Sequence, residues 1–267
     1  MRELLRAERL FDMSRSIAAA IFEGKGYPWE VLPEIGEFVV RLGQSLSEDE
    51  YERAGKDIWI ARDAAVAPTV SITGPVIIDH EAELRHCAFI RGKAVIGKNC
   101  VVGNSVEIKN AILFDNAQVP HFNYVGDSVL GYRAHMGAGA VTSNVKSDKS
   151  LVTVRTDDRI IATNLRKFGA MLGDYVEIGC NSVLCPGAVI GRGTTVYPTS
   201  CVRGFVPEHS VYKRADRIVP KLSLIHIFII ENMPFFISLP YQVLRMTCWR
   251  SVRLNTTAVS ELRPSSL

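Results

Sequence analysis

The stretch VIIDHEAELRHCAFIRGKAVI, residues 76–96, decides the fold, because a large aliphatic side chain returns in it at every sixth position. A second, mostly smaller apolar residue stands two positions before each of these. Neither an amphipathic helix nor a simple alternating strand keeps a period of six over such a length. The sixth-position residues are Ile60, Val66, Ile72, Ile78, Leu84, Ile90, Ile96, Val102, Ile108 and Phe114, and later Leu172, Ile178, Leu184, Ile190, Val196 and Val202.

A fixed short period predicts a solenoid in which each coil buries its apolar side on the next coil. Hexapeptide repeats are typical of β-helices, with one short strand per repeat. We therefore expect an all-β chain with a parallel β-helix over residues 56–212. A packed interior of this kind admits no sugar or acyl chain. A site must then lie on an outer face or between copies of the chain, because flat solenoid faces often assemble symmetrically.

The segment before the repeats, residues 1–55, predicts a small helical cap over one end of the solenoid. Apolar residues recur at helical spacing in its first half, and a second helix is expected over residues 31–43. Ser47 followed by Glu50 has the pattern of a capping box, which indicates a short third helix.

Two further segments interrupt or follow the repeats. The period is lost over residues 143–169, where LVTV and RIIA are the expected strands of a protruding loop or hairpin. Residues 213–267 are expected to be a tail, disordered or non-native after about residue 220, because no period continues and the string LSLIHI resembles translated sequencing adapter. Prolines and polar residues break the apolar run over 222–244, so no membrane insertion is expected.

The overall composition argues against several classes of protein. A net charge of +3 over 267 residues is too weak and too dispersed to indicate a nucleic-acid partner. Six cysteines occur without any CxxC spacing, which argues against a disulfide framework and a zinc knuckle. The N-terminal segment mixes charged with apolar residues, unlike a signal peptide. These features favour a reduced, cytoplasmic location.

The most specific motif is PHFNYVGDS at residues 120–128, followed by GAGAVTSN at 137–144. Upstream, IRG at 90–92 and GNSVEIKN at 103–110 stand at fitting distances. In these motifs the chain resembles the acetyltransferase half of the bacterial N-acetylglucosamine-1-phosphate uridyltransferase/glucosamine-1-phosphate acetyltransferase family, a group of hexapeptide-repeat transferases.

The resemblance implies a left-handed β-helix and a homotrimer that binds acetyl-CoA, as co-substrate, between neighbouring subunits without a metal. It implies an N-acetyltransferase acting on an amino-sugar phosphate such as glucosamine 1-phosphate, in the synthesis of UDP-N-acetylglucosamine and cell-envelope precursors. The family's nucleotidyltransferase half, with its glycine-rich phosphate loop, has no counterpart in this sequence. We therefore expect uridylyl transfer to fall to a separate nucleotidyltransferase partner.

By that resemblance His121 is the general base and Glu107 orients its imidazole. A base is needed because a sugar ammonium must lose a proton before its nitrogen attacks a thioester, and histidine titrates near neutral pH. Arg91 and Lys109 match residues that hold the substrate phosphate, a task that suits a guanidinium and an ammonium. The other matched residues are Tyr124, Asn144, Lys167 and His135 for the sugar, and Ala138, Gly139 and Cys180 for the coenzyme.

Three departures from the family concern the rim of the sugar site. His135 stands at a substrate-binding asparagine position, Val145-Lys146 replaces a Tyr-Asp pair, and the loop before Lys167 is longer. Acetyl transfer is therefore better supported than glucosamine 1-phosphate as the acceptor. The departures also keep open a non-catalytic or regulatory solenoid that binds sugar nucleotides.

A second alternative is a γ-class carbonic-anhydrase-like zinc enzyme, which uses the same solenoid architecture. Three imidazoles and a water would make a sound catalytic zinc site. The candidate ligands are His80, His86, His121 and His135, the first two of which are separated by one hexapeptide. The residues around them do not resemble that class.

Overall fold

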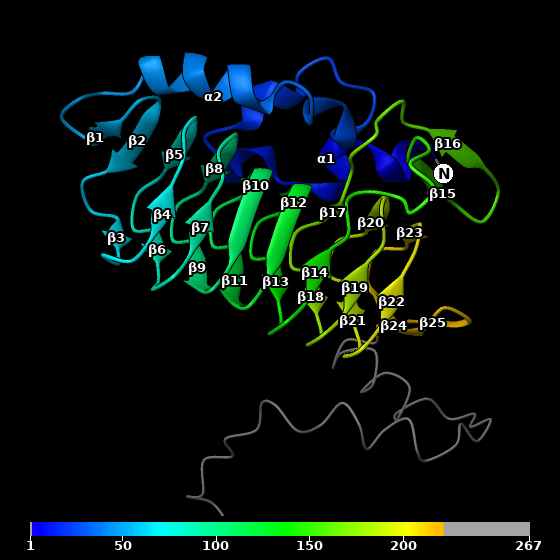
Figure 1. Cartoon of the computed structure of the whole chain (residues 1–267). Coiled ribbons are helices and arrows are strands. Elements are labelled where there is room, and N and C mark those ends of the chain that lie inside the picture. Colours follow the sequence, from blue (N-terminus) through cyan, green and yellow to red (C-terminus); the bar gives the residue numbers. More distant parts are fainter. Residues whose placement is uncertain (1, 222–267) are drawn as a thin grey trace, which may run out of the picture. The chain divides into compact units, whose positions relative to one another are not determined.

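The computed structural model describes residues 2–221, and most of this part of the chain is a parallel β-helix (Figure 1). Its strands form three ladders, in which each strand pairs with the strands one coil before and one coil after it. β10 (Glu107–Leu113) and β12 (Tyr124–Leu130) bend around a corner, so their two halves belong to different ladders. The expected all-β class and hexapeptide β-helix are confirmed.

The ladders contain the following strands. The first has β2 (Ile58–Ala61), β5 (Val76–Ile78), β8 (Ala94–Ile96), the second halves of β10 and β12, β17 (Ala170–Leu172), β20 (Ala188–Ile190) and β23 (Phe205–Val206). The second has β3 (Ala65–Val66), β6 (Glu83–Leu84), β9 (Val101–Asn104), β11 (Gln118–His121), β13 (His135–Met136), β18 (Glu177–Ile178), β21 (Thr195–Val196) and β24 (Ser210–Arg214). The third has β4 (Ser71–Ile72), β7 (Phe89–Ile90), the first halves of β10 and β12, β14 (Val141–Thr142), β19 (Val183–Leu184) and β22 (Cys201–Val202). Two end strands run antiparallel to their neighbours: β1 (Tyr51–Gly55) beside β2, and β25 (Arg217–Pro220) beside β24.

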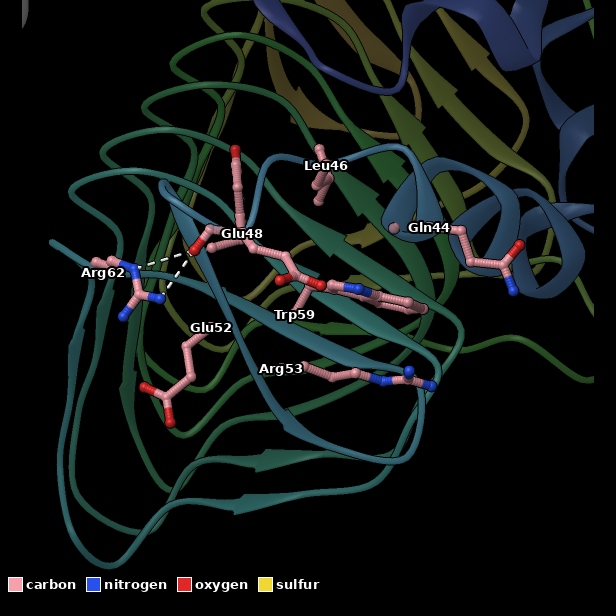
Figure 2. Close-up of a pocket in the computed structure, with 9 residues that line it drawn as sticks. Gln44, Leu46, Glu48, Glu52, Arg53, Trp59 and Arg62 are labelled. Atoms are coloured by element: carbon pink, nitrogen blue, oxygen red, sulfur yellow. Dashed lines mark hydrogen bonds between the residues drawn. The ribbon is translucent and has the colours of Figure 1, made fainter.

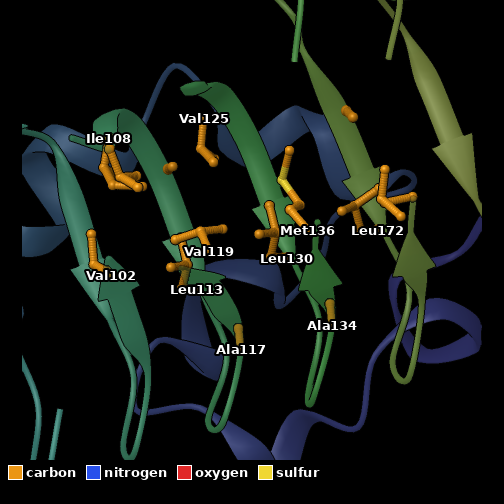
Figure 3. Packing of buried hydrophobic residues seen from close by; sticks show 14 of the residues in the cluster. Val102, Ile108, Leu113, Ala117, Val119, Val125, Leu130, Ala134, Met136 and Leu172 are labelled. Atoms are coloured by element: carbon orange, nitrogen blue, oxygen red, sulfur yellow. The ribbon is translucent and has the colours of Figure 1, made fainter. Parts of the chain in front are cut away.

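The interior of the coil is filled by the aliphatic residues of the repeat, as Figure 3 shows for Val102, Ile108 and Val119. All three are fully buried. The corners between ladders contain residues of positive φ, such as Asn99 and Asn116. Many of these corner residues are spaced by six along the chain. Asparagine is one of the few residues with a side chain that tolerates this left-handed conformation. The six-residue period is thus a strand plus a left-handed corner.

The period slips by one residue before Phe114, where the sequence-based assignment is wrong. Ala94 pairs with Ala111, seventeen positions on, whereas earlier coils advance by eighteen. Leu113 therefore takes the interior position. Phe114 points out of the coil and stacks on Phe11, with ring centroids 5.1 Å apart.

The segment before the β-helix is less regular than predicted. Its helical elements are η1 (Arg2–Leu5), α1 (Ala7–Leu10), η2 (Met13–Arg15), η3 (Ala19–Phe22), η4 (Pro28–Val31) and α2 (Ile35–Gln44). The first helix is interrupted because Asp174 of a distant coil binds the backbone on both sides of the break: its N–H donates to Leu10 O (2.9 Å) and its carboxylate accepts from Asp12 N (2.7 Å). α2 is confirmed. The third helix is wrong, since Ser47 begins a single turn that leads into β1.

The helical segment covers the outer side of the first ladder, not an end of the solenoid (Figure 1). Residues of a strand alternate between two sides, so Ile77 and Val95 point outward between inward neighbours. They are fully buried in one cluster with Trp29, Ile35 and Val39. This surface of the β-helix is therefore a second hydrophobic core, closed by the N-terminal segment.

The excursion from the repeat closes the rest of the same surface. β15 (Thr153–Arg155) and β16 (Ile160–Ala162) form an antiparallel hairpin, which confirms the two strands expected in the excursion. Val152 and Val154 are fully buried in the same cluster as Val189 of β20. The hairpin is thus anchored as a cover, and it returns the chain to the β-helix at β17.

Among residues 2–221, no helix is long and apolar enough to cross a bilayer. The part of the expected tail beyond residue 221 lies outside the described residues.

Candidate active site

The predicted base, His121, is the last residue of β11, at the corner between the second and third ladders. The next residue, Phe122, has a positive φ of 52°, which is unusual for a bulky side chain. Asn123, which is 3% exposed, holds this corner from inside the coil. Its side chain accepts from His121 N (3.1 Å) and donates to the carbonyls of Gly137 (2.8 Å) and Ala140 (3.0 Å). The imidazole itself is exposed and makes no hydrogen bond to a described residue.

The predicted coenzyme residues lie along the same edge as His121. Gly139 N donates to His121 O (3.0 Å), and Asn181 N donates to Ala138 O (2.9 Å), so Ala138 and Cys180 follow His121 in the next two coils. A Cβ on Gly139 would meet the Asn181 side-chain oxygen at 2.2 Å, and the φ of Gly139 is +72°. Glycine adopts this left-handed conformation without strain, and a larger residue here would also have to displace the Asn181 side chain.

Glu107 lies in the third ladder, where its carboxylate binds Arg91 and not the predicted partner, His121. In the third ladder Phe89, Glu107 and Tyr124 are level with one another. The Glu107 carboxylate accepts from Arg91 Nη1 at 2.5 Å, and this hydrogen bond raises the pKa of the guanidinium. In this structure Glu107 binds Arg91, so its role in orienting the imidazole stays a prediction.

Three cationic side chains lie near the edge of the third ladder that is opposite His121: Arg91, Lys109 and Lys167. Lys109 lies two residues beyond Glu107, and Lys167 enters where Phe168 N donates to Asn144 O (2.9 Å). Burial lowers the pKa of the Lys109 ammonium, and the nearby charges of Lys167 and Arg91 lower it further, whereas Asp127 opposes them. A multiply charged anion bound beside these three cations would relieve the repulsion between them.

Asp127, which was not among the predicted site residues, binds several side chains at this edge of the third ladder. Its carboxylate belongs to a residue that is 5% exposed and accepts from Asn110 Nδ2 (2.8 Å) and Asn144 Nδ2 (2.5 Å). Asn144 also donates to Tyr124 Oη (3.2 Å), and Asn110 donates to Leu32 O (3.1 Å) of the N-terminal segment. Its place in the motif PHFNYVGDS was the available signal. Asp127 thus joins the predicted sugar-contacting residues Tyr124 and Asn144 into one network.

Within one chain His135 lies apart from the other predicted sugar-site residues, so its role in the sugar site stays a prediction. It pairs with Gln118, at the opposite end of β11 from His121. Its Nδ1 lies 2.8 Å from the Glu177 carboxylate. The sequence separation of the two histidines did not reveal that they lie in adjacent coils at opposite edges of the second ladder.

The zinc alternative is not supported by the histidine positions. His80 Nδ1 lies 3.0 Å from Asp63, and His86 Nδ1 lies 3.0 Å from Thr69. One hexapeptide apart means one corner apart, so these two imidazoles belong to different corners of the coil. Within residues 2–221 no group of three His, Cys, Asp or Glu side chains is placed to hold a metal ion.

One cavity, of about 380 Å³, lies elsewhere, at the N-terminal end of the solenoid (Figure 2). It is lined by Trp59 of β2 and by Glu48, whose carbonyl accepts from Arg62 Nη2 at 2.8 Å. None of the predicted site residues lines it. Apart from His135, the predicted residues instead lie on the outer surface of the third ladder and its edges.

Comparison with known proteins identifies relatives of the repeat region. Residues 72–166 match the family described as GMPPB C-terminal domain. The bifunctional protein GlmU of Methanococcus maripaludis is 34% identical over an alignment of 215 positions that covers 73% of this chain and 48% of that protein. The chain is related to this bifunctional family through its hexapeptide-repeat region. The bifunctional sugar-1-phosphate nucleotidylyltransferase/acetyltransferase of Sulfurisphaera tokodaii is 33% identical over 101 residues, 38% of this chain and 25% of that protein.

The chain therefore spans less than half the length of these two relatives. A solved structure of a mutant of AntD, an N-acyltransferase from Bacillus cereus in complex with dTDP-4-amino-4,6-dideoxyglucose and coenzyme A, is 16% identical with a TM-score of 0.34. The superposed region covers 67% of this chain and 90% of the AntD chain. A TM-score of this size carries no argument about function.

Proposed function

We propose that this chain is an acetyl-CoA-dependent N-acetyltransferase whose acceptor is an amino-sugar phosphate. One observation carries the proposal: the third ladder has an exposed histidine at one edge and three cations, Arg91, Lys109 and Lys167, at the other. A proton acceptor beside an anion-binding cluster is what acylation of a phosphorylated amino sugar requires. The name of the Sulfurisphaera tokodaii relative, a bifunctional sugar-1-phosphate nucleotidylyltransferase/acetyltransferase, is consistent with it.

In the proposed reaction the amine nitrogen attacks the thioester carbonyl while His121 takes a proton from the amine. The N–C bond forms, the C–S bond breaks, and the sulfur of coenzyme A takes up a proton as it leaves. Gly139 N is already bound to His121 O, so a main-chain donor to the carbonyl oxygen would have to come from Ala138. Arg91 and Lys109 hold the phosphate, and Tyr124 and Asn144 contact the sugar.

The proposed site also needs a second wall. His121 is exposed on the edge of a convex solenoid, where water reaches it from one side. Another copy of the chain against this edge would exclude that water and complete a groove for acetyl-CoA. We therefore propose a homotrimer with coenzyme A between subunits, and a separate protein for nucleotidylyl transfer.

The test is release of free coenzyme A from acetyl-CoA by the full chain, with glucosamine 1-phosphate as acceptor. We expect turnover, and a loss of roughly 100- to 10,000-fold in His121→Ala. His86→Ala is the matched control, because His86 occupies the same edge two coils earlier and contacts Thr69. Equal losses in both variants would remove His121 as the base.

A folded protein that binds the acceptor without releasing coenzyme A would contradict the enzyme proposal. It would support the non-catalytic solenoid. Turnover with other amino-sugar phosphates only would correct the acceptor and keep the reaction.

A further inference from the structure

Two cysteines lie side by side on the outer surface of the third ladder, in adjacent coils beyond the proposed active site. Val183 of β19 pairs with Cys201 of β22, and Cys185 follows Val183 by two residues. Leu184 and Val202 point into the core, so both cysteines point outward. Their Sγ atoms are 3.5 Å apart.

The two thiols differ in their access to solvent. Cys201 is exposed, whereas Cys185 is 7% exposed. Burial raises the pKa of the Cys185 thiol to about 11, and the neighbouring Cys201 adds to this, while Arg203 opposes it. A dissolved oxidant therefore reaches Cys201 first, and Cys185 is held as a thiol beside it.

The remaining cysteines in the described part of the chain are not arranged in this way. Cys87 and Cys180 are exposed and have no sulfur neighbour among the described residues, and Cys100 is fully buried in the coil. Cys100 Sγ donates to Phe114 O. Contact between sulfurs of adjacent coils is thus specific to one pair within residues 2–221.

We propose that Cys185 and Cys201 form a two-thiol oxidation site that a hydroperoxide converts to a reversible intrachain disulfide. With hydrogen peroxide, the Cys201 thiolate attacks one oxygen and the O–O bond breaks, so that Cys201 becomes a sulfenic acid and the other oxygen leaves as hydroxide, which takes up a proton to become water. Cys185 then loses its proton and attacks the Cys201 sulfur, which expels a second water as the S–S bond forms. Two thiols lose two electrons in all, and one peroxide gains them.

The sulfurs must approach from 3.5 Å to about 2.05 Å. Cys185 lies two residues beyond Val183, the residue level with Cys201, so closing the bond requires a shift of the backbone after β19 as well as side-chain rotation. The product would join two consecutive coils. It would also stiffen one wall of a cavity of about 350 Å³, lined by Cys185, Arg203 and Ser143. Ser143 precedes Asn144 of the proposed sugar site.

Peptide mapping of the full chain tests the proposal. The protein is treated with a small excess of hydrogen peroxide, alkylated under denaturing conditions and cleaved with trypsin without reduction. Cys180 and Cys185 share the tryptic peptide 168–192, and Cys201 lies on 193–203. The Cys180→Ser variant therefore makes the assignment unambiguous.

We expect the 168–192 and 193–203 peptides to be linked in wild type and in Cys180→Ser, and the link to disappear on reduction. Cys185→Ser should abolish the link and leave Cys201 as a sulfenic acid that a dimedone probe traps. Circular dichroism verifies that each variant is folded. Oxidation of Cys201 and Cys87 at equal rates, with no link between the two peptides, would overturn the proposal.

Discussion

The two edges of the third ladder are built differently. At the His121 edge only the backbone is held: Asn123 binds the corner, and the imidazole remains exposed. At the Asp127 edge the side chains themselves are held, because Asp127 binds Asn110 and Asn144 inside a buried network. Under the proposed function, this difference means that one chain alone preorganises the edge that would bind the phosphate, whereas the edge that would transfer the proton needs substrate and a neighbouring surface to complete it.

Asn123→Ala should have the largest effect, because it removes three hydrogen bonds of a buried amide. We expect a loss of about 3 kcal/mol in the free energy of unfolding, measured by urea titration. Where the variant is folded, kcat should fall at least about tenfold with KM for the acceptor little changed, because the corner that positions His121 is loosened. A change in KM alone would contradict this assignment of the two edges.

Asp127→Ala should act on the other edge. It leaves the buried amide of Asn110 without one of its acceptors and frees Asn144, so we expect a loss of about 2 kcal/mol in stability. Steady-state kinetics should show a raised KM for the acceptor. Asp127→Asn, which has nearly the same shape, is the matched control and should recover part of the stability. A fall in kcat with unchanged KM would show that the two edges are not separable.

Lys109→Ala should raise KM for the phosphorylated acceptor by about tenfold or more, because a charged hydrogen bond is lost. The same variant should leave KM for an amino sugar without phosphate unchanged. Lys98→Ala, an exposed lysine at a different corner, is the control. Equal effects on phosphorylated and unphosphorylated acceptors would remove the phosphate role of Lys109.

The smallest effect concerns pH. Because burial and neighbouring cations lower the pKa of Lys109, its ammonium is neutralised at a lower pH than that of an ordinary lysine. KM for the phosphorylated acceptor should therefore rise on the alkaline side. Lys167→Ala removes one repelling charge, so the pH at which KM begins to rise should move upward. An unchanged or lower midpoint would show that Lys167 does not influence Lys109.

Local periodicity was sufficient to predict the β-helix, because strand and corner repeat in the sequence itself. The two hairpin strands were expected in the segment where the period is lost. Periodicity failed at Phe114, because the coil before it is one residue shorter than the earlier coils. Leu113 and Phe114 are then both plausible interior residues from the sequence, and the structure places Leu113 inside. The N-terminal segment was mispredicted because a tertiary partner, Asp174, breaks its first helix. Its docking on the first ladder also depends on the outward Ile77 and Val95, which the period of six ignores.

The candidate site was predicted in part. The motif residues of the third ladder, Lys109, Tyr124 and Asn144, do lie together, because they stand in adjacent coils. Asp127 was missed because its importance lies in what it binds, which only the folded chain shows. The role of His135 stays a prediction, because within one chain it lies at the other edge of the second ladder from His121.

The most direct test of the proposed separation is the dissociation constant of glucosamine 1-phosphate from His121→Ala, measured by titration calorimetry beside wild type. If the His121 edge serves chemistry and the Asp127 edge serves binding, the variant should bind the phosphate as tightly as wild type while releasing no coenzyme A. Loss of binding together with turnover would contradict the account.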